Sequence, residues 1–451
     1  MDETRALAQF VTATQYADLP SSLIDDLKII VLDTFSAGFI GTAQPWAHMV
    51  VEMVRELGGT PEASVINQTW QTDISRAALA NGVLIGAFEC EPLTGSHASG
   101  TVLPAVLAVC ESDGQDGKAF LTALALGFEV SARIARTAVG LESTRGFHNP
   151  GTQGPFGAAA AVGKLYGLDD AMLTSAFGIA GSGSAGLLEF AWTGADTKRL
   201  HLGRASQLGL ESVLLAQKGF RGPPTVLEGR YGYYHAFSLP TPLDRLLDGL
   251  GDTWAIQPPS LKSYGTHVTH QAVVQAIQTF TQDHPIDPQT ITRVVVRGDP
   301  HIMDDRHTVR EPETVMGGQY SLPFTTAVAL TRDLSNPLVY NDAAIRDPVV
   351  RELARRIELI PVEATGHTEP GVYPAEVLLE CDGQSYTLAT QPHKGSPRNP
   401  FTWDEICHKF RRCTAAIISD KQAEGLIDVV EHLEQVANMA EVAEATALQK
   451  S

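Results

Sequence analysis

The sequence predicts a large, mainly α domain joined to a smaller α+β domain. Three observations lead to this fold class. With 451 residues, the chain is too long for one simple core. About the first 220 residues place apolar side chains at helical spacing in one segment after another. Alternating, β-branched patterns appear only later, roughly between residues 262 and 395.

Helical patterns account for most of the first half of the chain. We expect helices at 22–40, 74–88 with Asp73 as N-cap, 102–110, 120–138, 156–166, from Asp169–Asp170 onward, and 203–218. The 156–166 segment is rich in Gly and Ala. Such a helix can approach its neighbours closely and be buried on every side.

The pattern changes after the proline pairs at 223–224 and 258–259. Residues 292–297 are β-branched, and 375–381 and 385–390 flank Asp382-Gly383, a strong hairpin signal. Helical segments are expected between them at 270–280, 324–331 and 349–357. Helical spacing returns at 404–413 and 423–437, and we expect these helices to pack back on the first domain. The predicted division is 1–258 plus 400–451 for the helical domain and 259–399 for the smaller one.

Composition excludes several classes of protein. Lys and Arg number 33 against 52 Asp and Glu, a net charge of −19, which argues against a nucleic-acid partner. No apolar run reaches membrane-spanning length, and the N-terminus does not resemble a signal peptide. The five cysteines are scattered without metal spacing, as in reduced cytoplasmic proteins. We therefore expect a cytoplasmic enzyme with neither a nucleic-acid nor a membrane partner.

Basic residues and histidines nevertheless gather between residues 145 and 204. The stretch contains Arg145-Gly-Phe-His148, a Gly-rich segment with Thr152, and Thr197-Lys198-Arg-Leu-His201-Leu-Gly-Arg204. A local positive cluster in an acidic protein indicates a pocket for a small anion, because a cleft focuses the field locally. Lys198 and Arg204 are candidates to clamp carboxylates.

Two other segments carry groups suited to proton transfer. Glu89-Cys-Glu91 follows a predicted helix and precedes His97, and neighbouring acids have their pKa values pushed apart. Lys262, Tyr264, His267 and His270 start the second domain and could reach back across a domain cleft. The two histidines could instead bind a metal, but the sequence shows no third ligand and no HExxH motif. We expect no metal and no cofactor.

These motifs, in this order, resemble the MmgE/PrpD family. They are Asn81-Gly82, Glu89-x-Glu91, His97, Leu103-Pro104-Ala105, Gly146-Phe-His148, Gly154-x-Phe-Gly157, Gly194-x-x-Thr197-Lys198-x-x-His201-x-Gly203-Arg204 and Lys262-x-Tyr264. The family includes 2-methylcitrate dehydratase, cis-aconitate decarboxylase and iminodisuccinate epimerase. The resemblance implies a homodimer with a cofactor-free site between a helical and an α+β domain. By motif, the family's site residues fall on Glu89, Glu91, His97, His148, Lys198 and Lys262.

The chain departs from the family pattern at two places. Glu89-Cys-Glu91-Pro92 stands where Asp-x-Asp-Asp is usual, and Phe324 offers no hydroxyl where many members have tyrosine or another polar residue. The resemblance implies a lyase that dehydrates or decarboxylates a small di- or tricarboxylate. Glu89, Glu91 or His97 would be the base and His148 the acid. Substrate-binding candidates are Arg145, Thr152, His201, Arg204, Tyr264 and His267. The alternatives are a dicarboxylate epimerase or isomerase and an inactive carboxylate-binding homologue.

Overall fold

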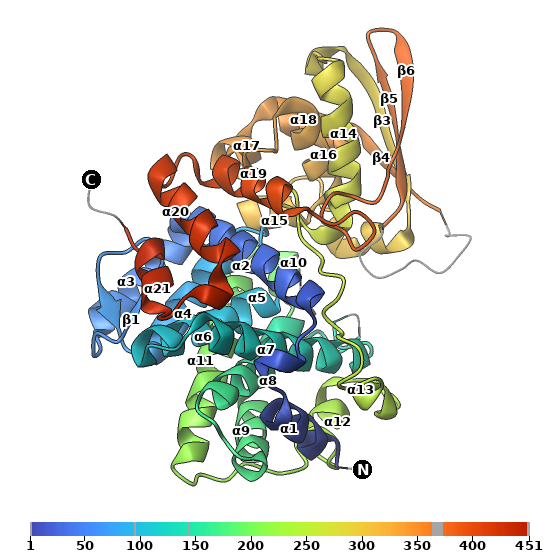
Figure 1. The fold of residues 1–451 in the computed structure, drawn as a ribbon. Coiled ribbons are helices and arrows are strands. Elements are labelled where there is room, and N and C mark those ends of the chain that lie inside the picture. The colour runs from blue at the N-terminus through green and yellow to red at the C-terminus, as the bar shows by residue number, and fades with distance from the viewer. Residues whose placement is uncertain (1, 94–95, 143, 363–372, 449–451) are drawn as a thin grey trace.

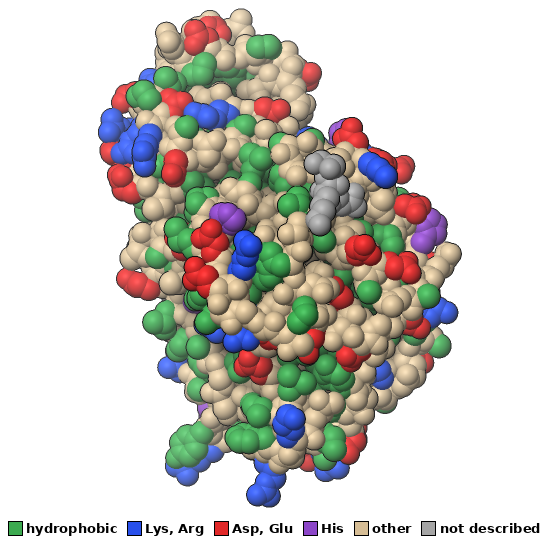
Figure 2. Space-filling view, turned by 90° about the vertical axis from the view of Figure 1, so that its left-hand side faces the viewer, with side chains coloured by type: hydrophobic (Ala, Val, Ile, Leu, Met, Phe, Trp, Pro, Cys, Tyr) green, Lys and Arg blue, Asp and Glu red, His purple; other side chains and the backbone are tan. Residues whose placement is uncertain are grey.

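The computed structural model describes residues 2–93, 96–142, 144–362 and 373–448. A broad helical body carries a narrower lobe that contains the main sheet (Figure 1). On the face shown in Figure 2, acidic and basic side chains are scattered over both parts rather than gathered into one large field. None of the described helices is both long and apolar enough to cross a membrane. All five cysteines are buried and carry no disulfide.

The helical part contains the predicted helices in the expected order, but the helices Glu3–Ala13 and Pro45–Leu57 were not predicted, and two others begin earlier than expected, at Asn149 and Thr197. Its main elements are α1 (Glu3–Ala13), α2 (Ser21–Thr42), α3 (Pro45–Leu57), α4 (Ile74–Ile85), α5 (Ala98–Thr101), α6 (Leu103–Asp113), α7 (Gly117–Thr137), α8 (Asn149–Leu165), α9 (Asp170–Gly183), α10 (Phe190–Thr193), α11 (Thr197–Gln217), α12 (Tyr233–Phe237) and α13 (Asp244–Leu247). Asp73 caps α4 as predicted, because its carboxylate accepts the Arg76 N–H at 3.0 Å. A two-stranded ribbon, β1 (Ala63–Ser64) with β2 (Gln71–Thr72), escaped prediction because each strand has only two residues.

Glycines allow the central helices to touch backbone to backbone. A Cβ on Gly157 of α8 would lie 2.0 Å from Ser131 Oγ on α7. A Cβ on Gly203 of α11 would lie 2.3 Å from the Leu79 carbonyl oxygen on α4. The close approach of α4 and α11 brings the segment after α4 beside the first turn of α11.

The smaller part combines one sheet with helices. Its elements are α14 (Gln271–Asp283), β3 (Ile291–Gly298), α15 (Val315–Tyr320), α16 (Leu322–Thr331), α17 (Asp342–Arg346), α18 (Pro348–Arg356), β4 (Ile357–Pro361), β5 (Ala375–Cys381) and β6 (Gln384–Ala389). The strand order is β4-β3-β5-β6, with β3 and β4 parallel and the other pairs antiparallel. Asp382 and Gly383 have φ of 51° and 72°, as the predicted hairpin requires. The sequence analysis missed β4, which continues directly from α18.

The last three helices return to the helical part, as expected. These are α19 (Trp403–Thr414), α20 (Asp420–Glu431) and α21 (Ala440–Thr446), and α19 and α20 pack on α2 (Figure 1). Lys409 on α19 donates hydrogen bonds to Asp33 Oδ1 on α2 and to the Lys262 carbonyl, each at 2.5 Å. The C-terminal helices therefore tie the helical core to the segment that carries Lys262. The domain boundaries 1–258 plus 400–451 and 259–399 stay a prediction.

Candidate active site

The segment after α4 has an unusual backbone. Glu89, Ser96 and His97 have φ of 55°, 86° and 58°, in the left-handed region that non-glycine residues rarely adopt. Each such residue costs free energy that the surrounding structure must offset, and this kind of strain gathers at functional sites. The backbone thus presents Glu89 and His97 in conformations that local preference alone would not select.

Glu89 lies between two buried lysines from different parts of the chain. Its carboxylate forms an ion pair with Lys198, from the first turn of α11. Its other oxygen is 2.8 Å from Lys262 Nζ, which also lies 3.5 Å from Glu91 Oε1. All four side chains are at most 3% exposed. Burial and the charges of Lys262, Arg199 and Arg306 lower the pKa of Lys198 well below its usual value, whereas the ion pair with Glu89 favours its charged, ammonium form.

Glu91 holds His97 in a fixed orientation. His97 Nδ1 lies 2.6 Å from Glu91 Oε1. Burial raises the pKa of the Glu91 carboxyl, but the Lys262 charge and the His97 hydrogen bond outweigh it and bring the pKa to about 2. Glu91 is therefore ionised and stabilises a proton on His97 Nδ1.

His148 is the second acid–base group. Its backbone N–H donates to the Gly186 carbonyl at 2.9 Å, and its ring centroid is 5.9 Å from that of His97. Its Nδ1 lies 3.1 Å from His201 Nδ1, so one ring donates a hydrogen bond to the other. Burial, with the nearby rings and cations, lowers the pKa of His148 well below its usual value. Burial and Lys198 lower the pKa of His201 to about 4, so both rings are neutral at neutral pH.

Three further imidazoles gather on the small-domain side. The ring of His267 lies 5.7 Å from that of His270 and 4.5 Å from that of His307. One nitrogen from each ring lies within 4.8 Å of the others. The sequence analysis saw no third histidine, because His307 comes from a turn far along the chain (3₁₀ helix Asp305–His307).

Three imidazoles can serve as a metal donor set, but the surrounding charge disfavours a cation. Burial lowers the pKa of all three rings, and the positive charge of Arg306 adds to this for each of them. His307 Nδ1 lies 2.8 Å from the Tyr320 carbonyl oxygen, to which it donates. The unpaired Nε2 of His307 therefore carries a lone pair, as a metal ligand does, while the charge of Arg306 opposes a cation in the His267–His270–His307 group.

The structure places the ring of Tyr320, rather than that of Phe324, beside the cluster. The centroid of the Tyr320 ring is 5.3 Å from Lys198 Nζ and 4.7 Å from that of the His267 ring. Phe324 is fully buried in the small domain, with its ring centroid 6.3 Å from that of Tyr340. Tyr320 is the last residue of α15 and lies four residues before Phe324.

The structure brings together all six residues that the motifs selected, together with His201 and His267. It does not bring four of the predicted substrate-binding residues to this cluster. Arg204 is exposed and bonds to Gln207 at 2.8 Å, because a step of six residues along the helix turns it about 120° away from Lys198. Arg145 is exposed and reaches the Ser238 carbonyl at 3.5 Å.

The other two residues are occupied elsewhere. The Thr152 hydroxyl is paired with the Tyr233 hydroxyl at 3.1 Å inside the helical core. Burial raises the pKa of Tyr264 to about 12, and the charges that act on its hydroxyl are those of Arg412 and Asp333.

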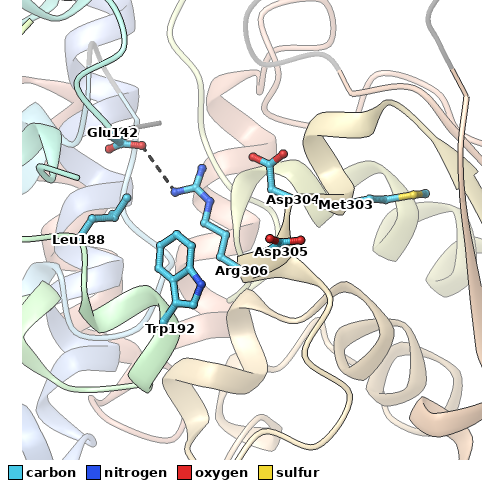
Figure 3. A pocket seen from close by; sticks show the side chains of 7 residues that line it. All are labelled: Glu142, Leu188, Trp192, Met303, Asp304, Asp305 and Arg306. Atoms are coloured by element: carbon cyan, nitrogen blue, oxygen red, sulfur yellow. Dashed lines mark ion pairs between the residues drawn. The ribbon is translucent and has the colours of Figure 1, made fainter. Parts of the chain in front are cut away.

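A pocket of about 460 Å³ opens where the two parts of the molecule meet (Figure 3). Its lining comes from both parts: Glu142, Leu188, Trp192, Met303, Asp304, Asp305 and Arg306. Arg306 Nη1 faces Glu142 Oε2 across it at 3.8 Å. The sequence analysis missed Arg306 and Glu142, because neither belongs to one of the motifs and only the fold brings them together.

The fold and the site define a two-domain protein with a buried acid–base cluster where a helical and an α+β domain meet. Two family models match the chain: the MmgE/PrpD N-terminal domain over residues 5–246 and the MmgE/PrpD C-terminal domain over residues 264–435. The chain therefore belongs to the MmgE/PrpD family, as its motifs suggested.

Several characterised relatives match almost the full chain. The cis-aconitate decarboxylase of Homo sapiens is 27% identical over 462 residues, which cover 96% of this chain and 92% of the relative. The enzyme of the same name from Mus musculus is 25% identical over 453 residues, covering 96% and 91%. That from Aspergillus terreus is 25% identical over 456 residues, covering 95% and 92%.

Proposed function

We propose that this protein is a lyase that removes carbon dioxide or water from a small di- or tricarboxylate without a cofactor. The observation that carries the proposal is the buried cluster itself. In this cluster the ionised Glu91 carboxylate contacts His97, and a neutral His148 and two lysines lie close by. The site is largely closed to water, and its backbone is strained at Glu89 and His97. The relatives' names favour decarboxylation of a substrate that resembles cis-aconitate.

The geometry supports roles for the two histidines that differ from the sequence expectation. The Glu91 carboxylate fixes the His97 ring through Nδ1, and we assign His97 as the proton donor. His148 is buried and neutral, so it is the better proton acceptor. Glu89 is held by Lys198 and Lys262, and we assign it to positioning these ammonium groups rather than to proton transfer.

The same residues accommodate either reaction. In decarboxylation the bond to the departing carboxylate breaks, its electron pair stays on the carbon, and His97 delivers a proton there. In dehydration His148 takes a proton next to a carboxylate while His97 protonates the leaving hydroxyl. The ammonium groups of Lys198 and Lys262 would stabilise the charge that develops in the transition state. A homodimer remains part of the prediction.

Product analysis in deuterated water tests the proposal. We expect cis-aconitate or a related tricarboxylate to lose carbon dioxide and the product to gain one deuterium. Water loss from a hydroxy-tricarboxylate such as 2-methylcitrate, without carbon dioxide, would select the dehydratase. Deuterium exchange at a stereocentre with neither product would select the epimerase. Binding of these carboxylates without any turnover would contradict a lyase.

Two variants extend this experiment, one inside the cluster and one control outside it. His97→Gln should lower turnover by about 100-fold or more. Arg204→Ala removes a predicted clamp that the structure places outside the cluster, and it should leave turnover unchanged.

A further inference from the structure

We propose that Arg306 binds one carboxylate of the substrate and that Glu142 is its displaceable counter-ion in the free protein. This inference rests on the proposed function, because it assumes a substrate with two or more carboxylates. Such a polyanion needs a positive charge that the protein has not already neutralised.

The site lysines do not meet this need by themselves. Lys198 and Lys262 face Glu89 and Glu91, so two ammonium groups are balanced by two carboxylates. The neighbouring Arg199 is buried and donates its Nε–H to the Ala87 carbonyl at 2.8 Å. Of these four cations, Arg306 is the one that lines the pocket, and its carboxylate partner Glu142 lines the same pocket.

Arg306 stands between the open pocket and the buried cluster. Its side chain is 18% exposed, and it extends toward Glu142 on the far wall (Figure 3). On its inner side its charge acts on the rings of His148 and His267 and on Lys198. A ligand carboxylate on the guanidinium would thus lie beside the acid–base groups.

The existing Arg306–Glu142 contact is weak enough to exchange. The 3.8 Å separation exceeds a hydrogen bond, and the Glu142 side chain is 30% exposed. Partly exposed ion pairs of this kind contribute about 0–1 kcal/mol. A guanidinium binds a free carboxylate through two parallel hydrogen bonds, a stronger arrangement. Asp304 and Asp305 also line the pocket, but both are exposed at its rim, where water and salt screen them.

The exchange would also join the two parts of the molecule through the substrate. Glu142 belongs to the helical part and Arg306 to the smaller part. Trp192 and Leu188 form an apolar wall of the same pocket and would shield the new ion pair from water.

Binding of tricarballylate, an unreactive tricarboxylate, tests the inference by calorimetry alongside steady-state kinetics. Arg306→Gln should raise Kd for tricarballylate and KM for the substrate by about tenfold or more, with a smaller effect on kcat. Glu142→Gln should bind tricarballylate more tightly than wild type, because it removes the competing carboxylate. Arg297→Gln, a matched loss of a 50%-exposed arginine on β3, should change neither value.

The outcomes separate this inference from the proposed function. Unchanged tricarballylate binding in a folded Arg306→Gln protein overturns the role of Arg306, even if wild type is an active lyase. The inference also fails if wild type does not bind tricarballylate. Arg306-dependent binding in a protein that turns over no carboxylate keeps the Arg306 site and rejects the lyase. Arg306→Lys keeps the positive charge but loses the pair of parallel hydrogen bonds. Its Kd for tricarballylate should lie between those of wild type and Arg306→Gln.

Discussion

The two sides of the site differ in how their charges are satisfied. On the helical side, Glu89 and Glu91 are joined to lysines and His97 by short, buried contacts. On the small-domain side, three uncharged imidazoles stand beside Arg306, whose carboxylate partner is 3.8 Å away. A preorganised charge network costs no reorganisation during reaction, whereas a loosely paired cation can take a new partner. We therefore expect the chemistry to lie on the helical side of the site and substrate recognition on the other.

Removing the central carboxylate should have the largest effect on stability. Glu89→Gln leaves Lys198 and Lys262 buried without their shared counter-charge, which should lower the free energy of unfolding by about 3–5 kcal/mol. Denaturant unfolding measures this. Glu313→Gln, at a side chain that is 82% exposed, is the matched control and should cost less than about 0.5 kcal/mol. Equal stability of the two variants would show that the helical side is not held by its charges.

Histidines on the two sides should differ in their effect on rate. His148→Gln should lower kcat by about 100-fold or more with the fold intact, through loss of general acid–base catalysis. His270→Gln should lower kcat by about tenfold or less, because His270 belongs to the His267–His270–His307 group, where we expect substrate recognition. Steady-state kinetics with circular dichroism as a check on folding measures both. If His270→Gln lowered kcat more than His148→Gln does, the chemistry would lie on the small-domain side instead.

The buried histidines should make the protein sensitive to acid. Burial and Arg306 lower the pKa of His307 to about 4, against about 6.5 in the unfolded chain. The unfolded state therefore binds more protons below pH 6.5, and the stability present above that pH is lost as the pH falls toward 4. For His307 alone the loss between pH 7.5 and pH 5 is about 2 kcal/mol.

His307→Asn should flatten the unfolding free energy against pH by that amount. Denaturant unfolding at pH 7.5, 6 and 5 measures the slope. His432→Asn, at a ring that is 50% exposed, serves as the control and should keep the wild-type slope. An unchanged slope in His307→Asn would mean that this ring is not held neutral by its surroundings.

The hydroxyl of Tyr320 should have the smallest effect. Tyr320→Phe keeps the ring beside Lys198 and His267, so kcat/KM should fall by about tenfold or less with stability retained. Tyr340→Phe removes a hydroxyl that pairs with Thr325 Oγ1 at 3.2 Å, away from the site. It should cost about 1 kcal/mol of stability and leave kcat/KM unchanged. If instead Tyr340→Phe lowered kcat/KM and Tyr320→Phe did not, the Tyr320 hydroxyl would have no role in the reaction.

The sequence by itself determined the features that depend on near neighbours. The helix order, the Asp73 cap and the Asp382-Gly383 turn follow from contacts within a few residues, and the structure confirms them. The motif resemblance also led to the family and to the six residues that meet at the site. The β1–β2 ribbon and β4 were missed because short strands are stabilised by their pairing partners rather than by their own sequence pattern.

Only the tertiary structure decided how each group is used. Arg204 lies six residues from Lys198 yet faces solvent, whereas Arg306 and Tyr320 act on Lys198 from more than 100 residues further along the chain. Glu89 and Glu91 look alike in sequence, but one neutralises two lysines and the other holds His97. Burial and charge are sums over all neighbours in space, so the protonation state of each residue emerges only when the two domains are in place.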